Sequence, residues 1–248
     1  RPSAVRALLA QKDSLPAREY QAAMDDMVRF AIRLQEVAGL DVVSDGEWRR
    51  RHYVGEFLQR IGGFEKVRPY RHAGEAKLAD VVVRRIRTAR PVWNKDAEFL
   101  VRHTTRLSKF ALPSPFLIAI RYWHPDFSRE AYPTIQHFME HLSRILRREA
   151  EALVEAGIDI IQIDDPALTY FCDRRLMSSA ETHDDRLRRD WDIDRQFPEA
   201  MQAINAIVDG LKAEIHLHCC HSVYRRQSAC VFDSPPEHAR LGPFHLHL

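Results

Sequence analysis

The sequence has 248 residues, of which 45% are hydrophobic and 29% charged, and this composition is typical of a globular protein with one large core. Its 37 basic and 35 acidic side chains give a net charge of +2, which does not indicate a nucleic-acid partner, and arginine clusters such as Arg49 to Arg51 are expected on solvated faces. We find no signal peptide and no apolar run that could cross a bilayer, so we expect a cytoplasmic enzyme with no membrane partner.

The first half of the chain alternates predicted helices with short apolar runs. Residues 17–38 follow the 3.6-residue period of an amphipathic helix and end at a glycine. The apolar run over residues 40–43 predicts a buried strand, and a second helix is expected over residues 53–60. Residues 64–90 predict a β-rich insertion that leads into another strand at residues 81–86.

The second half continues the alternation with longer elements. A near-continuous run of β-branched residues over 158–163 is the clearest predicted strand, because strands covered on both faces have this composition. The other predicted strands are residues 110–112 and 214–221. The predicted helices cover residues 94–105, 133–156 and 197–211.

Polar residues directly follow three of the predicted strands. Strands that alternate with helices form a parallel sheet with right-handed crossovers, as a closed barrel or an open sheet, and such folds bind ligands at the carboxyl edge. We therefore expect these strand ends to meet in one pocket. Helix-start or capping carboxylates are the alternative, purely structural interpretation of Glu47 and Asp164. The polar pairs are Asp45 and Glu47, Asp164 and Asp165, and His218 and Cys220.

The last predicted strand carries two residue types that bind metals. Alternate side chains of a strand share a face, so His216, His218 and Cys220 point to one side, whereas Leu217 and Cys219 point to the other. An imidazole and a thiolate two residues apart are typical zinc ligands, and the four cysteines of the chain do not predict a disulfide framework. The alternative is a buried strand that carries small thiols and a hydrogen-bonded histidine without a metal.

Three stretches in this order resemble a known family. Gly39 to Arg50, Ile161 to Leu168 and His218 to Cys220 are similar to motifs of the C-terminal catalytic domain of cobalamin-independent methionine synthase. The match is closer to the shorter stand-alone relatives of that domain, which include epoxyalkane:coenzyme M transferase. The loosely aligned pair Tyr122 and Trp123 resembles an aromatic that the family places beside its fourth strand.

The resemblance implies a fold, a cofactor and a reaction. The family fold is an α/β (β/α)8 barrel of the TIM type, with zinc at the carboxyl ends of its strands. His218 and Cys220 match the family's first two zinc ligands, and Glu47 and Asp164 match the acids that hold the homocysteine ammonium. The implied partners are a small-molecule thiol and a methyltetrahydrofolate-like donor, and the implied reaction transfers the methyl group to the thiol. The sequence does not identify the catalytic residues.

The family pattern also implies that the barrel is incomplete. We interpret the predicted strands as the second to the sixth of eight, with the first and the last strands missing. Residues 1–222 would form a partial barrel domain, and residues 223–248 a divergent tail. Two adjacent prolines at positions 235 and 236 argue against a buried strand in that tail. An open parallel sheet exposes unpaired backbone groups, so we expect the chain to self-associate.

Two alternatives to methionine synthesis stay open at this point. One keeps the barrel and the zinc but uses another thiol, such as coenzyme M, or a corrinoid donor. Coenzyme M carries a sulfonate that needs cations, so the acids Glu47 and Asp164 favour an amino-acid thiol. The other alternative is a truncated, non-catalytic barrel remnant, which the missing strands favour.

Overall fold

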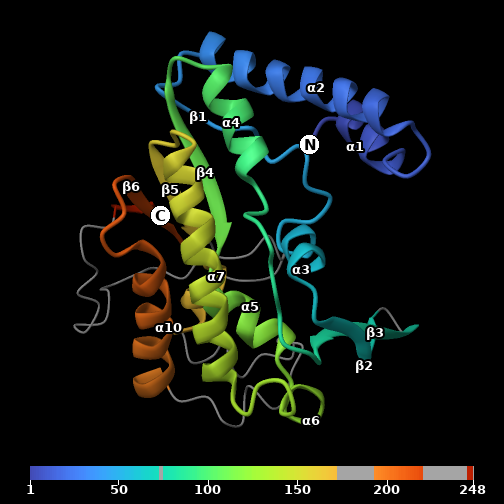
Figure 1. Cartoon of the computed structure of the whole chain (residues 1–248), viewed down its shortest axis with the longest axis vertical. Coiled ribbons are helices and arrows are strands. Elements are labelled where there is room, and N and C mark those ends of the chain that lie inside the picture. Colours follow the sequence, from blue (N-terminus) through green and yellow to red (C-terminus); the bar gives the residue numbers. More distant parts are fainter. Residues whose placement is uncertain (73–74, 172–192, 220–244, 248) are drawn as a thin grey trace.

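A computed structural model describes residues 1–72, 75–171, 193–219 and 245–247 (Figure 1). The strands are β1 (Val42–Val43), β2 (Phe64–His72), β3 (Glu75–Val82), β4 (Leu107–Pro113), β5 (Ile160–Asp164), β6 (Glu214–His218) and β7 (His245–His247). The helices are α1 (Ser3–Ala10), α2 (Ala17–Val37), α3 (Gly55–Ile61), α4 (Asn94–Arg102), α5 (Pro115–Tyr122), α6 (Pro125–Ser128), α7 (Ile135–Glu155) and α10 (Ile193–Val208), with a 3-10 helix at Pro166–Phe171.

The main sheet has five parallel strands in the order β1-β4-β5-β6-β7. Strands adjacent in this order are joined by helical crossovers where the connection is described, as expected for a parallel sheet. Within the described residues β1 and β7 each pair on one side only, so the sheet is open, in agreement with the prediction.

The prediction that residues 81–86 form a strand of the main sheet is wrong. The structure pairs β1 directly with β4, and Val81 and Val82 instead form the end of β3, which is antiparallel to β2. A hairpin brings neighbouring segments together at a small cost in chain entropy, and this local pairing takes the β-branched run out of the main sheet. Figure 1 shows this hairpin to one side of the main sheet, in the segment predicted as a β-rich insertion.

Gly63 fixes the base of that hairpin. Its backbone φ is +84°, and its carbonyl accepts hydrogen bonds from the amides of Val83 (2.9 Å) and Arg84 (3.1 Å). A Cβ atom at this position would lie 2.6 Å from the carbonyl oxygen of Arg84, closer than real contacts allow. Glycine is therefore required here both for its conformation and for the close approach of the two chain segments.

The tail also departs from the expectation that it supplies no strand. Residues 245–247 form β7, which pairs with β6 in parallel. The prolines that argued against a strand lie at positions 235 and 236, outside the described residues and before the short segment that pairs. The predicted boundary near residue 222 also lies outside the described part of the chain.

Helices cover one face of the main sheet and form the core with it. In Figure 1, α7 lies in front of the sheet with α10 packed beside it, and α7 also contacts α4, α5 and β4. α7 begins at Thr134, whose hydroxyl caps the helix by accepting from the amide of His137 (3.3 Å). The apolar face of α7 is fully buried through Phe138, Leu142 and Leu146.

The predicted helices over residues 17–38, 53–60, 94–105, 133–156 and 197–211 are confirmed within a few residues at each end. Helices α1, α5 and the short α6 were not predicted from the sequence. In α5 every residue from Pro115 to Ile120 is buried. A helix that is apolar on all sides has no amphipathic period, which is the signal that identified the other helices.

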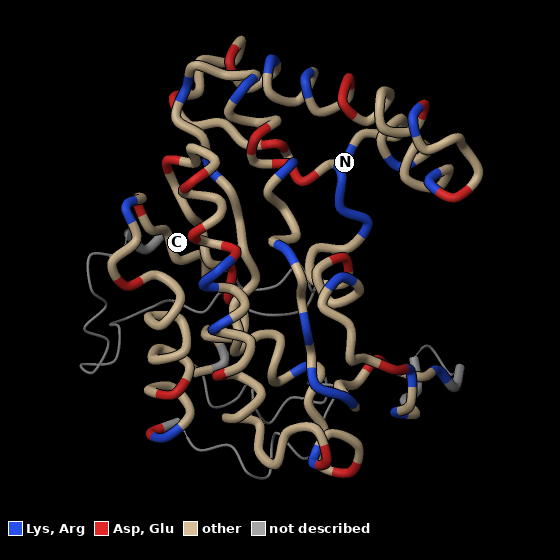
Figure 2. The backbone as a smooth tube through the Cα atoms, viewed as in Figure 1, with Lys and Arg blue, Asp and Glu red and all other residues tan. Residues whose placement is uncertain are grey.

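The described helices include none that is both long and apolar enough to span a membrane. Figure 2 shows basic and acidic residues interspersed along the described chain, as the small net charge of +2 suggests.

Candidate functional site

Strands β5 and β6 present one polar and one apolar face. Their register pairs Gln162 with His216 and Asp164 with His218, so these four side chains lie on the same side of the sheet. The intervening side chains belong to the hydrophobic core beneath the helices, as the alternation of the sequence predicts. These core residues are Ile161, Ile163, Leu217 and Cys219.

The carboxyl ends of β4, β5 and β6 form a single row. Pro113 pairs with Asp164, and Asp164 pairs with His218. The amide of Ser114 donates to the carbonyl of Asp164 (3.0 Å), and the amide of Asp165 donates to the carbonyl of His218 (2.9 Å). These backbone bonds fix the three strand ends relative to one another, so their side chains meet at one edge of the sheet.

Glu47 lies in a strained turn after β1. Its φ is +55°, and it is the only non-glycine residue with a positive φ in the described part of the chain. Such a conformation costs about 1–3 kcal/mol and persists only where its surroundings enforce it. The amide of Glu47 donates to the side chain of Asp45 (2.8 Å), and its carbonyl accepts from Arg1 (3.0 Å). The turn therefore holds the Glu47 carboxylate in one direction.

Arg50 forms an ion pair with this carboxylate. Its Nη1 atom donates to Oε1 of Glu47 and to the carbonyl of Ala111 in β4, both at 3.1 Å. The guanidinium lies 4.8 Å from the ring centre of Trp93 and 4.7 Å from that of Phe110, and the residue is only 1% exposed. The two rings stabilise the cation and hold it in place.

This arginine contradicts the expectation that the cluster at residues 49–51 is solvated. Arg49 is also partly buried and pairs with Asp25 (2.7 Å) and Asp96 (3.3 Å). The sequence does not indicate that Arg50 is more buried than Arg49 or Arg51. Its partners lie far away in the chain, and the cluster has no hydrophobic periodicity that would identify a buried face.

The carboxyl groups at this edge have pKa values that burial and neighbouring charges shift. Burial raises the pKa of Glu47, and the charges of Asp45 and Asp164 raise it further, whereas Arg50 lowers it. Burial also raises the pKa of Asp164, which the hydrogen bond from Gln162 (2.6 Å) and the charge of His218 lower in part. Two partly buried carboxylates repel each other when both are ionised. A cationic ligand between them would relieve this repulsion.

Tyr53 joins the same group from the segment before α3. Its hydroxyl donates to the carbonyl oxygen of Asp164 (3.2 Å). Burial raises the pKa of Tyr53 well above its ordinary value of 10, and the charges of Asp164, Asp165 and Glu47 raise it further. The phenol is therefore a neutral donor at physiological pH. The sequence analysis did not identify Tyr53, because nothing in its local pattern sets it apart.

Asp165 is a structural partner of the neighbouring strand end. It is fully buried, accepts from the hydroxyl of Ser114 and from the amide of Ala167 (3.0 Å), and burial raises its pKa to about 7. Ser114 is also the N-cap of α5, because its hydroxyl accepts from the amide of Leu117 (2.9 Å). The pair ties the end of β5 to the start of α5.

The structure therefore brings Glu47, Asp164 and His218 to one edge, whereas Cys220 lies outside the described residues. The described part of the chain contains no group of three or more potential metal ligands. His216 shares the polar face, but its Nε2 atom already contacts Oε1 of Glu214 (2.8 Å). Among described side chains, His218 is thus the one predicted metal ligand that the edge presents.

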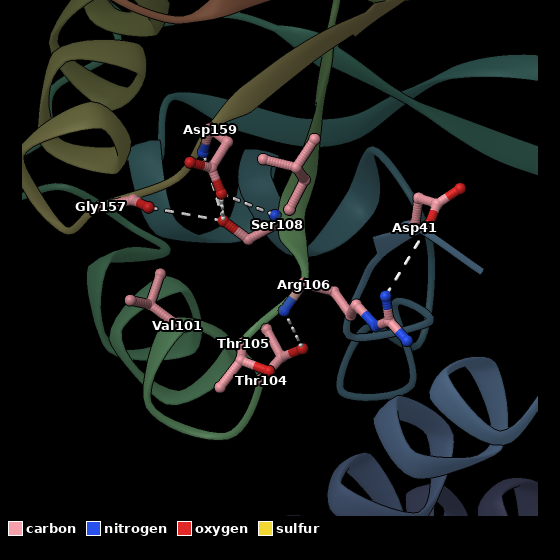
Figure 3. Close-up of a pocket in the computed structure, with 9 residues that line it drawn as sticks. Asp41, Val101, Thr104, Thr105, Arg106, Ser108, Gly157 and Asp159 are labelled. Atoms are coloured by element: carbon pink, nitrogen blue, oxygen red, sulfur yellow. Dashed lines mark hydrogen bonds and ion pairs between the residues drawn. The ribbon is translucent and has the colours of Figure 1, made fainter. Parts of the chain in front are cut away.

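A separate hollow of about 550 Å3 lies at the opposite end of the strands (Figure 3). There Asp159 accepts from the amide (2.8 Å) and the hydroxyl (2.9 Å) of Ser108, and Arg106 lies 3.8 Å from Asp41. These groups bind one another at the amino ends of β1, β4 and β5. In barrel-type folds this end serves stability, so we assign the hollow no catalytic role.

The family follows from a comparison with known proteins. A profile described as "Cobalamin-independent synthase, Catalytic domain" matches residues 3–230. The chain belongs to this family. The resemblance of the three sequence motifs to the catalytic domain of cobalamin-independent methionine synthase is thereby confirmed.

Relatives of the family cover most of this chain. The methionine synthase of Pyrococcus abyssi is 28% identical over 219 residues, which make up 87% of this chain and 56% of that protein. The 5-methyltetrahydropteroyltriglutamate–homocysteine methyltransferase of Aliivibrio fischeri is 30% identical over 228 residues, or 89% of this chain and 27% of that protein. The chain spans about half the length of the methionine synthases that it matches.

Solved structures of the family share the fold. The B12-independent methionine synthase of Shewanella sp. W3-18-1, solved in complex with selenomethionine, superimposes with a TM-score of 0.63 at 27% identity. The match covers 84% of this chain and 54% of that one. A second structure, from Listeria monocytogenes, has a TM-score of 0.64 at 20% identity and supports the fold alone. The fold is therefore α/β of the TIM-barrel type, as predicted.

Replacing Ser114 with alanine tests the link between β5 and α5. The change removes the cap of α5 and a hydrogen bond to Asp165, so we expect the free energy of unfolding to fall by about 2 kcal/mol at pH 8. The cost should be nearer about 1 kcal/mol at pH 5.5. Burial raises the folded-state pKa of Asp165, so stability is lost as the pH rises through about 7, and the Ser114 bond limits that loss.

Ser143→Ala is the control, because it removes a buried hydroxyl whose hydrogen bonds go to the backbone carbonyls of Met139 and Ala203 and to no titratable group. Chemical denaturation of both variants at the two pH values measures the difference. A cost of Ser114→Ala that is the same at both pH values would show that the hydroxyl does not stabilise the Asp165 carboxylate.

Proposed function

We propose that this chain binds an amino-acid thiol of the homocysteine type at the carboxyl edge of its sheet and takes part in methyl transfer to that thiol. The observation that carries the proposal is the meeting of Glu47, Asp164 and His218 at one edge in a chain of this family. The names of the relatives support the reaction, since they are methionine synthases and a homocysteine methyltransferase.

Glu47 and Asp164 would hold the substrate ammonium. Each carboxylate is partly buried, and each has a pKa that its surroundings raise, so a cation between them relieves the repulsion. Arg50 keeps the Glu47 carboxylate in place, and Gln162 does the same for Asp164. Because both supports are formed in the protein itself, the acids need little rearrangement when the substrate binds.

His218 and Cys220 would hold a zinc ion beside the acids. His218 lies on the polar face, in register with Asp164, and its imidazole suits zinc, so the described part of the edge fits such a site. When bound, zinc would supply the positive charge that keeps a substrate thiol deprotonated and nucleophilic near neutral pH. Cys219 would not contribute, since it is buried in the apolar core on the other face.

The methyl donor would be of the folate type, by analogy with the relative named for 5-methyltetrahydropteroyltriglutamate. Coenzyme M is a less suitable acceptor thiol, because its sulfonate would face two carboxylates at this edge.

Calorimetry with homocysteine tests the ammonium site. We expect Glu47→Gln and Asp164→Asn each to weaken homocysteine binding by about tenfold or more, because each removes one charge-assisted contact. Binding of 4-mercaptobutyrate, which lacks only the amino group, should be weak in the wild-type protein and unchanged by either substitution. Glu155→Gln, on the exposed side of α7, is the control for net charge. Equal binding of the two thiols would rule out an ammonium site at this edge.

Metal analysis of purified, zinc-loaded protein tests the other half of the site. Cys220→Ser should lose most of the zinc, because it removes a thiolate ligand, and Cys219→Ser should retain it. Circular dichroism checks that both variants fold, since Cys219→Ser places a hydroxyl in the core. The assignment of faces is wrong if both variants keep the same amount of zinc, or if only the Cys219 change strips it.

A further inference from the structure

Four basic side chains gather on the solvent side of α7 and on the segment between β3 and α4, and we call them the basic cluster. Three members occupy positions i, i+3 and i+7 of α7, which share one face of the helix. The fourth follows β3. The members are His141, Arg144, Arg148 and Arg85. The arginines are exposed and the histidine is partly exposed, and Figure 2 shows basic positions on both segments.

Tyr132 joins the two segments. Its hydroxyl oxygen accepts from the amide of Ile86 (2.9 Å) and contacts Nδ1 of His141 (2.8 Å). The guanidinium carbon of Arg85 lies 5.5 Å from the centre of the Tyr132 ring, and the centre of that ring lies 5.9 Å from the centre of the His141 ring. Tyr132 is only 1% exposed. This buried phenol therefore holds the segment with Arg85 beside the α7 face with His141.

The same hydrogen bonds determine which nitrogen of His141 is available to a ligand. Because the Tyr132 oxygen accepts from Ile86, its hydroxyl proton can be donated to Nδ1, and the ring proton then lies on Nε2. Nε2 has no hydrogen-bond partner among the described residues, and it is not one of their polar atoms that are sealed from solvent. Burial lowers the pKa of His141, and the three arginines of the cluster lower it further, so the neutral ring offers an accessible N–H donor near pH 7.

The positive charge of the cluster is not balanced by acids. Other arginines of the same two segments are paired, Arg84 with Glu65 and Arg147 with Glu151. By contrast, none of the cluster's arginines has a carboxylate partner in the described part of the chain. The sequence has no acidic residue at positions 81–95. An anion placed between these guanidinium groups would relieve their mutual repulsion.

Glu140 is the one acid among residues 137–148 of α7. It borders a hollow of about 600 Å3 between α7 and α10, together with Glu199, and forms no ion pair within the described residues. Glu140 therefore leaves the positive charge on the side of Tyr132 without a partner.

The donors of the cluster favour a phosphate group over other ligands. They are cations and N–H groups, which exclude a metal ion. Guanidinium groups pair with phosphate oxygens through two parallel N–H bonds, a geometry that lysine does not offer. A phosphate group carries about −1.5 to −2 charges near pH 7 and has three strong acceptor oxygens. A carboxylate has a single charge and two oxygens, so it matches several separate cations less well.

We propose that the basic cluster binds a phosphate dianion, either free or as the phosphate group of a small molecule. Its oxygens would accept from the guanidinium groups of Arg85 and Arg144 and from Nε2 of His141. Arg148, one turn further along α7, would add positive charge at the rim of the site. The proposal does not depend on methyl transfer by this chain.

Proton–carbon NMR of the histidine rings in the full chain tests the proposal. At pH 7.5 and constant ionic strength, inorganic phosphate should shift the His141 signals along a saturable curve, and His141→Gln assigns those signals. Arg85→Gln and Arg144→Gln should each weaken binding about three- to tenfold, because each removes a charge-assisted contact. Arg18→Gln, at an exposed arginine near the start of α2, removes the same charge elsewhere and should change nothing.

Glycerol phosphate in the same titration distinguishes the two sources of the phosphate group. Tighter binding of glycerol phosphate than of inorganic phosphate would support a phosphorylated small molecule, and the reverse order would support the free anion.

Three outcomes would overturn the proposal. One is a shift that grows linearly with phosphate and is matched by sodium chloride at the same ionic strength, which indicates a general salt effect. Another is an unchanged saturable curve in the double variant Arg85→Gln, Arg144→Gln. Binding of acetate as tight as that of phosphate would refute the dianion as the class of ligand.

Discussion

The register of three parallel strands determines what this protein can bind. Because β4, β5 and β6 end in step, Pro113, Asp164 and His218 fall in one row although more than a hundred residues separate the first from the last. Backbone bonds from Ser114 and Asp165 lock the row. A shift of one residue in β5 would turn Asp164 into the core and bring an apolar side chain to the edge, so the packing of Ile161 and Ile163 under the helices specifies the polar face as well.

Arg50 is the second element on which the candidate site depends. A buried guanidinium is costly unless its donors and its charge are matched. Here Nη1 of Arg50 donates to Glu47 and Ala111, and two aromatic rings lie against the cation. The arginine fixes the acid that we assign to the substrate ammonium. The strained turn at Glu47 is kept in place by these contacts together with Asp45.

Local patterns in the sequence predicted the long amphipathic helices and the buried strands, because burial on one face leaves a period that a single chain shows. The strand pairing was harder: residues 81–86 have the composition of a sheet strand, yet Val81 and Val82 pair with the adjacent β2. Glu47, Asp164 and His218 were accessible as polar residues after strands, with motifs that resemble a family. Arg50 and Tyr53 were not, because their roles come from contacts with residues distant in the chain.

Carbon-13 NMR titration of the side-chain carboxyl carbons of Glu47 and Asp164, with and without homocysteine, tests the central claim most directly. The account predicts that both carboxyls titrate above their ordinary pKa values in the free protein, and that homocysteine lowers both pKa values together because its ammonium favours the charged acids. Resonances assigned through Glu47→Gln and Asp164→Asn make the result specific to each residue. A response of only one carboxyl, or an equal response to 4-mercaptobutyrate, would contradict a shared ammonium site at this edge.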